Sequence, residues 1–167
     1  MNIESAIKRA LEYERKIRDL YFEGASALKG KRGENIFETL GKDEQYHVEY
    51  LEKKLKEWKK KGDFGSDIVV SMIPQKEDIE RSVDKLKTRL TEDHRGLVQQ
   101  ILNSALKAEI ETSKFYSDMV DALPEQGKRL FENFLKIEEN HIKTVQYELD
   151  FISGTGYWFN IKEFDME

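Results

Sequence analysis

Apolar positions recur along this chain at steps of three and four residues, which is the spacing of one face of an α-helix. The first stripe begins at Ile3 and continues through Leu11 and Ile17 to Tyr21, so it covers about five helical turns. The same spacing predicts three further long helices. The expected helices cover about residues 3–28, 34–61, 95–123 and 126–153.

Helix-ending signals set these boundaries. The glycines Gly30 and Gly33 end the first helix, and Pro124 ends the third. The second helix ends at three lysines followed by Gly62, where cations favour the helix C-terminus and glycine can cap it. We interpret the whole lysine-rich stretch 53–61 as a solvated helix end rather than a nucleic-acid patch.

Two stretches lack this long periodicity. Residues 63–94 begin with turn-like and apolar stretches and continue with a short charged helix, expected at Glu77–Leu90. We interpret them as a crossover connection. The tail, residues 154–167, contains Tyr157-Trp158-Phe159 and is expected to pack on the bundle or to form a dimer contact.

An internal repeat relates the two halves of the chain. A shift of about 95 positions brings the first helix onto the third, and a shift of about 94 brings the second onto the fourth. Each half is therefore a helical hairpin, and each hairpin alone leaves an apolar face exposed. The repeat predicts an all-α fold: one domain, residues 1–167, in which two hairpins joined by a long crossover form a four-helix bundle.

The amino-acid composition limits which partners and which metal ligands are expected. The 167 residues carry a net charge of −5, which gives no reason to expect binding to nucleic acid or to an anionic membrane. The absence of cysteine excludes disulfides, iron–sulfur clusters and thiol nucleophiles, so carboxylates, imidazoles or backbone oxygens must hold any metal. We found no signal peptide and no membrane-spanning stretch, so a cytoplasmic location is expected.

Six side chains at matching positions of the repeat are candidate metal ligands. Two of them form each E-x-x-H pair, Glu44 with His47 and Glu138 with His141, one turn apart on the same helix face. The others, Glu14 and Glu109, interrupt apolar stripes, where a charge is costly unless it is paired or binds a metal. The alternatives are buried salt bridges for these two glutamates and structural core positions for the histidines.

Further polar residues near these positions are assigned other roles. Tyr21 and Tyr116 lie two turns beyond Glu14 and Glu109 on the same faces. Each is a core aromatic residue, a hydrogen-bond donor to a ligand carboxylate, or both. The remaining neighbours are expected to be structural or solvated: His94, Glu111 and Glu139.

The order Glu, E-x-x-H, Glu, E-x-x-H, with one element per helix, resembles the ferritin-like di-iron carboxylate proteins. The Ala-Leu-x-x-Glu-x₆-Tyr segments around Glu14 and Glu109 resemble, more narrowly, the di-iron domain of rubrerythrins, over residues 1 to about 153. This resemblance implies a ferritin-like bundle with two iron ions. It implies Glu44 and Glu138 as bridging ligands, with one histidine on each metal and the other glutamates terminal. Such a donor set also accommodates manganese or zinc.

The same resemblance implies redox activity toward dioxygen or hydrogen peroxide. The chain lacks the cysteine-rich iron domain that rubrerythrins usually append, so a separate electron donor is expected. Peroxidase-type rubrerythrins carry an extra glutamate where this chain has Thr112. The alternatives are an iron-handling ferroxidase and a non-catalytic metal-binding bundle, and a homodimer or another small homo-oligomer is the expected assembly.

Overall fold

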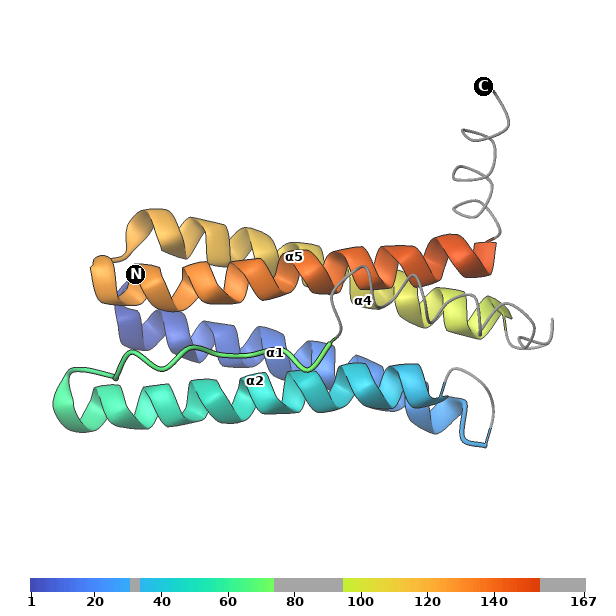
Figure 1. Cartoon of the computed structure of the whole chain (residues 1–167), viewed down its shortest axis with the longest axis horizontal. Helices are drawn as coiled ribbons and strands as arrows, with labels where there is room; N and C mark the ends of the chain where they lie inside the picture. The colour runs from blue at the N-terminus through green and yellow to red at the C-terminus, as the bar shows by residue number, and fades with distance from the viewer. Residues whose placement is uncertain (31–33, 74–94, 154–167) are drawn as a thin grey trace, which may run out of the picture.

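The structure is a computed structural model that describes residues 1–30, 34–73 and 95–153. These residues form four long helices (Figure 1): α1 (Ile3–Ala27), α2 (Glu34–Lys61), α4 (Arg95–Ala122) and α5 (Glu125–Ser153). The predicted all-α bundle of two hairpins is confirmed. Every helix end lies within one residue of the position expected from the sequence.

Local sequence explains where the helices begin and end. The Asn2 side chain caps α1 by accepting a hydrogen bond from the Ser5 N–H at 2.8 Å. At the end of α2, Gly62 has a φ of +65°, and its N–H donates to the Trp58 carbonyl at 2.8 Å. Glycine adopts this left-handed conformation without steric cost. The turn between α4 and α5 is only two residues long and includes Pro124.

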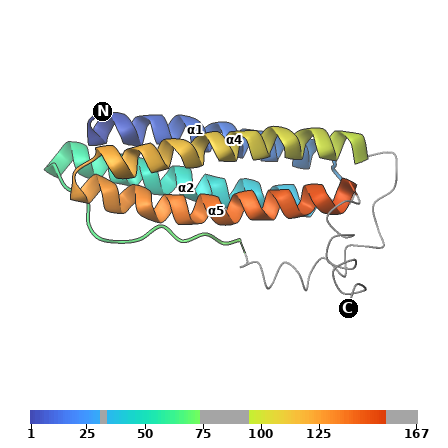
Figure 2. The same ribbon diagram turned by 90° about the horizontal axis from the view of Figure 1, so that it is seen from above.

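The helices pack most closely within each hairpin and less closely between the hairpins. Each hairpin is closely packed, α1 against α2 and α4 against α5, and the two hairpins meet mainly through α1 and α4. The helices α2 and α5 form the opposite side of the bundle (Figure 2). Residues 63–73, which we call the covering segment, run in extended form along this α2–α5 side in both views (Figures 1 and 2).

The covering segment is anchored by three buried side chains. Phe64, Val69 and Ile73 are buried, whereas Ile68 and Val70 are exposed. The start of the crossover is therefore part of the packed domain. The crossover's expected charged helix, its His94 and the aromatic tail 154–167 lie outside the described residues.

Lys54 departs from the sequence-based expectation. It was expected to be solvated with the rest of the lysine run, but it is fully buried. Its ammonium group donates to the Gly65 carbonyl at 3.2 Å and pairs with the Asp67 carboxylate. The expectation was wrong at this position because the covering segment folds back over α2 and encloses one lysine.

The hydrophobic core is divided into two clusters by a charged layer. One cluster contains Ile7, Leu51 and Phe134, and the other contains Ile17 and Leu102. The candidate ligands lie between them along every helix. The fold thus places six ionisable side chains near mid-bundle with apolar packing on both sides. No helix in the described part of the chain is long and apolar enough to cross a membrane.

Candidate metal centre

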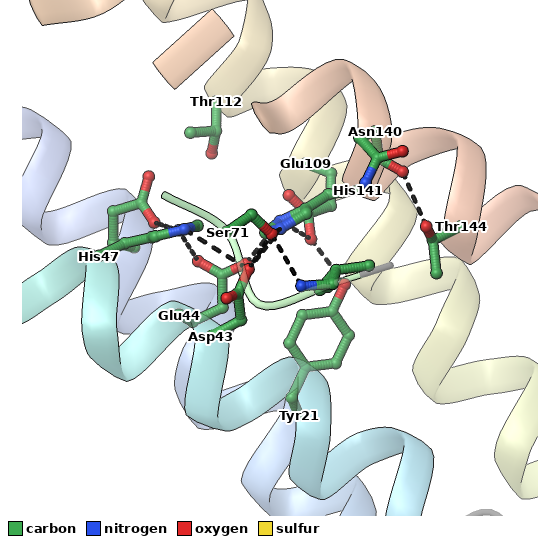
Figure 3. Close-up of polar contacts among 12 residues, drawn as sticks. Tyr21, Asp43, Glu44, His47, Ser71, Glu109, Thr112, Asn140, His141 and Thr144 are labelled. Atoms are coloured by element: carbon green, nitrogen blue, oxygen red, sulfur yellow. Dashed lines mark hydrogen bonds and ion pairs between the residues drawn. The ribbon is translucent and has the colours of Figure 1, made fainter. Parts of the chain in front are cut away.

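All six candidate ligands are fully buried, and the four helices bring them into one cluster. The contributions are Glu14 from α1, Glu44 and His47 from α2, Glu109 from α4, and Glu138 and His141 from α5. Each lies on the helix face that also carries the apolar core residues, so the periodicity that buries the core buries the charges too. Figure 3 shows the polar contacts at the centre of this cluster.

The side chain of Glu44 is shared between two three-residue sets. Its Oε2 lies 3.3 Å from His47 Nδ1, which is also 3.1 Å from Glu14 Oε2. Its Oε1 lies 2.8 Å from His141 Nδ1, which is 3.7 Å from Glu109 Oε1. Within each set the candidate ligand atoms lie within 4.8 Å of one another, so each set could hold a metal ion. One glutamate with an oxygen in each set has the geometry of a bridging ligand.

Glu138 lies in the same charge cluster but in neither of these sets, nor in a third set of possible ligands formed by Asp43, His47 and His141. Both of its carboxylate oxygens are buried without a hydrogen-bond partner. Glu44 Oε1, Glu109 Oε2, His47 Nε2 and His141 Nδ1 are also buried without a hydrogen bond, since the 2.8 Å contact between Glu44 Oε1 and His141 Nδ1 is an ion pair. Buried polar atoms are normally satisfied, so a concentration of unsatisfied ones needs an explanation. Among the described residues, Glu57 Oε2 is the only such atom outside this cluster.

The two tyrosines hold Glu14 and Glu109 by hydrogen bonds between opposite hairpins. Tyr21 on α1 donates a hydrogen bond to Glu109 Oε1 on α4 at 2.6 Å, and Tyr116 on α4 donates to Glu14 Oε1 on α1. The hydrogen bonds expected from the sequence are therefore present. The pairing is crosswise, since each tyrosine contacts the glutamate of the other hairpin rather than the one on its own helix.

Asp43 belongs to the cluster and was missed in the sequence. Its Oδ2 lies 2.9 Å from His141 Nε2 and 3.5 Å from His47 Nε2. The Ser71 hydroxyl donates to the same oxygen at 2.6 Å, and the Met72 N–H donates to Oδ1. The available signal was its position four residues before His47, on the same helix face. Nothing in the sequence pattern marks Ser71, because the covering segment has no helical periodicity.

Burial and mutual repulsion perturb the carboxylates of the cluster. Burial, followed by the charge of Glu14, raises the pKa of Glu44 to about 7. Burial and the charge of Glu109 raise the pKa of Glu138 well above its usual range. The pKa of Glu14 is also raised by burial, but its hydrogen bond to His47 and the charge of that imidazole lower it to a net value below the usual one.

The pKa values of both histidines are raised, although burial alone would lower them. Burial lowers the pKa of His47, but the charge of Glu44 and the hydrogen bond to Glu14 outweigh it and raise the pKa to about 10. Burial also lowers the pKa of His141, but the charge of Glu44 and the hydrogen bond to Asp43 outweigh it and hold this pKa well above its usual value. Without metal, protons on the imidazoles and on some carboxyl groups must therefore balance the negative charge.

The residues present fit a pair of divalent cations. Four glutamates and two imidazoles supply oxygen and nitrogen donors, which iron, manganese and zinc all accept. Two divalent ions would balance the charge of the four glutamates and provide partners for the unsatisfied atoms. The identity of the metal does not follow from this donor set.

The neighbouring residues behave largely as expected. Glu111 and Glu139 are exposed, as expected for solvated positions beside the candidate ligands. Thr112 is buried, and its hydroxyl donates to the Ala108 carbonyl of its own helix at 2.9 Å. This position therefore adds no carboxylate to the cluster.

No protein-family model, curated protein or solved structure matches the chain. The six buried acidic and imidazole side chains, with their unsatisfied atoms, are therefore the observation that points to a metal centre.

Proposed function

We propose that the chain is a rubrerythrin-like protein that binds two metal ions, iron by the family resemblance, and uses them to reduce dioxygen or hydrogen peroxide. The observation that carries this proposal is the cluster of six buried donors in which nearly all unsatisfied polar atoms of the described residues are found. Buried acids and imidazoles of this number are costly unless they are compensated by cations.

The proposal assigns a distinct task to each group. Glu44 would be a ligand to both metal ions, because one of its oxygens faces each histidine Nδ1. Glu138 would be the second bridging ligand by the family resemblance, and both of its oxygens are buried without a hydrogen-bond partner. The tyrosines fix the orientation of Glu14 and Glu109 by hydrogen bonds. Residues that hold ligands in this way commonly tune metal affinity.

A bound iron pair supplies the electrons for reduction of the oxidant. The two hydrophobic clusters that flank the six candidate ligands limit their contact with bulk water. The 167 residues include no cysteine for an iron–sulfur or rubredoxin-type centre, and the proposal therefore includes an electron donor outside them.

The proposal is tested by anaerobic titration with Fe²⁺ followed by exposure to dioxygen or hydrogen peroxide. The expected result is two ions per chain, oxidised with a near-ultraviolet absorption change. A Glu44→Gln variant should lose this response, whereas Glu139→Gln, at an exposed position beside a ligand, should retain it. Failure of the wild-type protein to bind iron or to oxidise it contradicts the proposal.

The same titration separates the alternatives. A ferroxidase that handles iron would continue to oxidise Fe²⁺ beyond two ions per chain and release it as a mineral or to a carrier. A non-catalytic bundle would retain a redox-inert ion such as zinc and show no oxidation. Metal analysis of protein purified without a metal-affinity step identifies the native ion.

A further inference from the structure

The two histidines present the same edge to a single acidic residue. Their rings are nearly parallel, with centroids 5.3 Å apart and planes 17° apart. Their Nδ1 atoms lie near the glutamates, while their Nε2 atoms lie 2.9 Å (His141) and 3.5 Å (His47) from Asp43 Oδ2. One carboxylate oxygen therefore faces the far edge of both imidazoles (Figure 3).

Asp43 is in turn held by consecutive residues of the covering segment. The Met72 N–H donates to Oδ1, and the Ser71 hydroxyl donates to Oδ2 at 2.6 Å. The Ile73 N–H donates to the Ser71 oxygen at 3.1 Å. Both oxygens of the Asp43 carboxylate are thus tied to the segment that covers the α2–α5 side of the bundle.

The repeat does not provide an equivalent residue in the second hairpin. The shift of 94 positions that brings Glu44 onto Glu138 brings Asp43 onto Ile137. An isoleucine has no hydrogen-bonding group for an imidazole. His141 Nε2 instead lies 2.9 Å from Asp43 Oδ2 across the bundle and 3.5 Å from the Ser71 hydroxyl oxygen, so one carboxylate of the first hairpin faces the imidazoles of both halves.

The chemistry of imidazole gives this arrangement a role. A neutral histidine that binds metal through Nδ1 carries its hydrogen on Nε2, and a carboxylate facing Nε2 accepts that hydrogen, fixes the ring and strengthens the ligand. Resting on the function proposed above, we propose that Asp43 is the shared positioning residue of both histidines and that it couples metal binding to the docking of residues 71–73.

The coupling works in both directions. When metal occupies both Nδ1 atoms, both Nε2–H groups are directed at Asp43. These two N–H groups then hold the Asp43 carboxylate in the orientation that accepts from Ser71 and Met72. A docked covering segment in turn keeps Asp43 in place for the histidines. Thermodynamic linkage is reciprocal: if bound metal stabilises the docked covering segment by a given free energy, the docked segment stabilises bound metal by the same amount.

The first test measures zinc affinity by competition with a chromophoric chelator, because Zn²⁺ undergoes no redox change. Wild type should bind two ions. Asp43→Asn, which places an amide N–H where the carboxylate accepts, should weaken both ions about 10- to 100-fold. Ser71→Ala should weaken both by a smaller factor, and Glu14→Gln should weaken mainly the ion of its own set. Glu139→Gln is the matched control and should equal wild type.

The second test follows hydrogen exchange of the Met72 amide by NMR, with and without zinc. In wild type, zinc should slow this exchange, because the amide donates to Asp43. In Ser71→Ala the slowing should be smaller, and in Asp43→Asn it should be absent at zinc concentrations that saturate the variant. A purely structural role for Asp43 would lower stability without removing the zinc dependence.

The outcomes distinguish this inference from the proposed function. Two zinc ions bound by Asp43→Asn with wild-type affinity, or Met72 exchange that is independent of zinc in wild type, would overturn the inference and leave the metal centre intact. A wild-type protein that binds no metal would overturn both. If Asp43→Asn does not fold, Ser71→Ala decides: unchanged affinity and unchanged Met72 protection overturn the inference.

Discussion

Tyr21 donates a hydrogen bond of 2.6 Å to Glu109 on the opposite hairpin, and Tyr116 makes the reciprocal contact to Glu14. These contacts tie α1 to α4 at the depth where the core is charged. Both tyrosines are fully buried, and burial raises the pKa of each hydroxyl well above its usual value, so each acts as a neutral donor.

Tyr21→Phe should lower the stability of the metal-free protein by roughly 1–3 kcal/mol, because a buried carboxylate loses a donor. It should also weaken mainly the metal ion bound by the Glu109 set, whereas Tyr116→Phe should weaken mainly that of the Glu14 set. Urea denaturation and zinc titration measure the two effects. Tyr46→Phe, at an exposed position on α2, is the control. Equal effects of Tyr21→Phe and Tyr46→Phe would contradict the assigned contact.

Glu44→Gln should have opposite effects on stability and on metal binding. The pKa of Glu44 is raised from 4.5 to about 7, so its ionised form is unfavourable in the metal-free fold, and the neutral amide should stabilise that fold by roughly 1–3 kcal/mol at pH 8. Loss of the shared ligand should reduce metal binding in both sets. Denaturation and metal analysis of one preparation test this, and retention of two tightly bound ions would argue against a bridging role.

Glu148 provides a pH-dependent test outside the candidate centre. Burial alone raises its pKa from 4.5 to about 7, so the native state holds more protons than the unfolded state between these values. Stability should therefore fall as the pH rises through this window. Glu148→Gln should equal wild type near pH 4 and exceed it by roughly 1–3 kcal/mol at pH 8. A difference that does not change with pH would show that the carboxyl group is not titrating in this range.

Lys54→Met should destabilise the protein by roughly 1–3 kcal/mol, because the covering segment loses the ammonium group that binds Asp67 and the Gly65 carbonyl. Lys53→Met is a close control, since Lys53 pairs with the same aspartate but is largely exposed. Its effect should stay within about 0.5 kcal/mol. Equal losses in the two variants, measured by urea denaturation, would contradict the buried role of Lys54.

The sequence predicted the helices because their apolar spacing is regular and because Gly62 and Pro124 are strong end signals. The repeat predicted which acidic and imidazole side chains would meet, since two similar hairpins place equivalent residues at one depth. Their role as ligands remains a prediction.

Other parts of the cluster were not predictable in this way. Asp43 has no counterpart in the repeat, and its contacts come from the irregular covering segment, whose path leaves no periodic signal. Lys54 was misassigned for the same reason. Contacts between a helix and a distant extended segment depend on tertiary packing that no local pattern records.

The division of the hydrophobic core into two clusters has a consequence for how the chain unfolds. In the metal-free protein the two ends of the bundle are joined through a layer of buried acids and imidazoles that adds little apolar packing, so each end gains little from the folding of the other. Cations bound in that layer would attract all four helices at once and make the two ends melt together. Calorimetric unfolding should therefore be broad without metal and become a single sharp transition when metal is added.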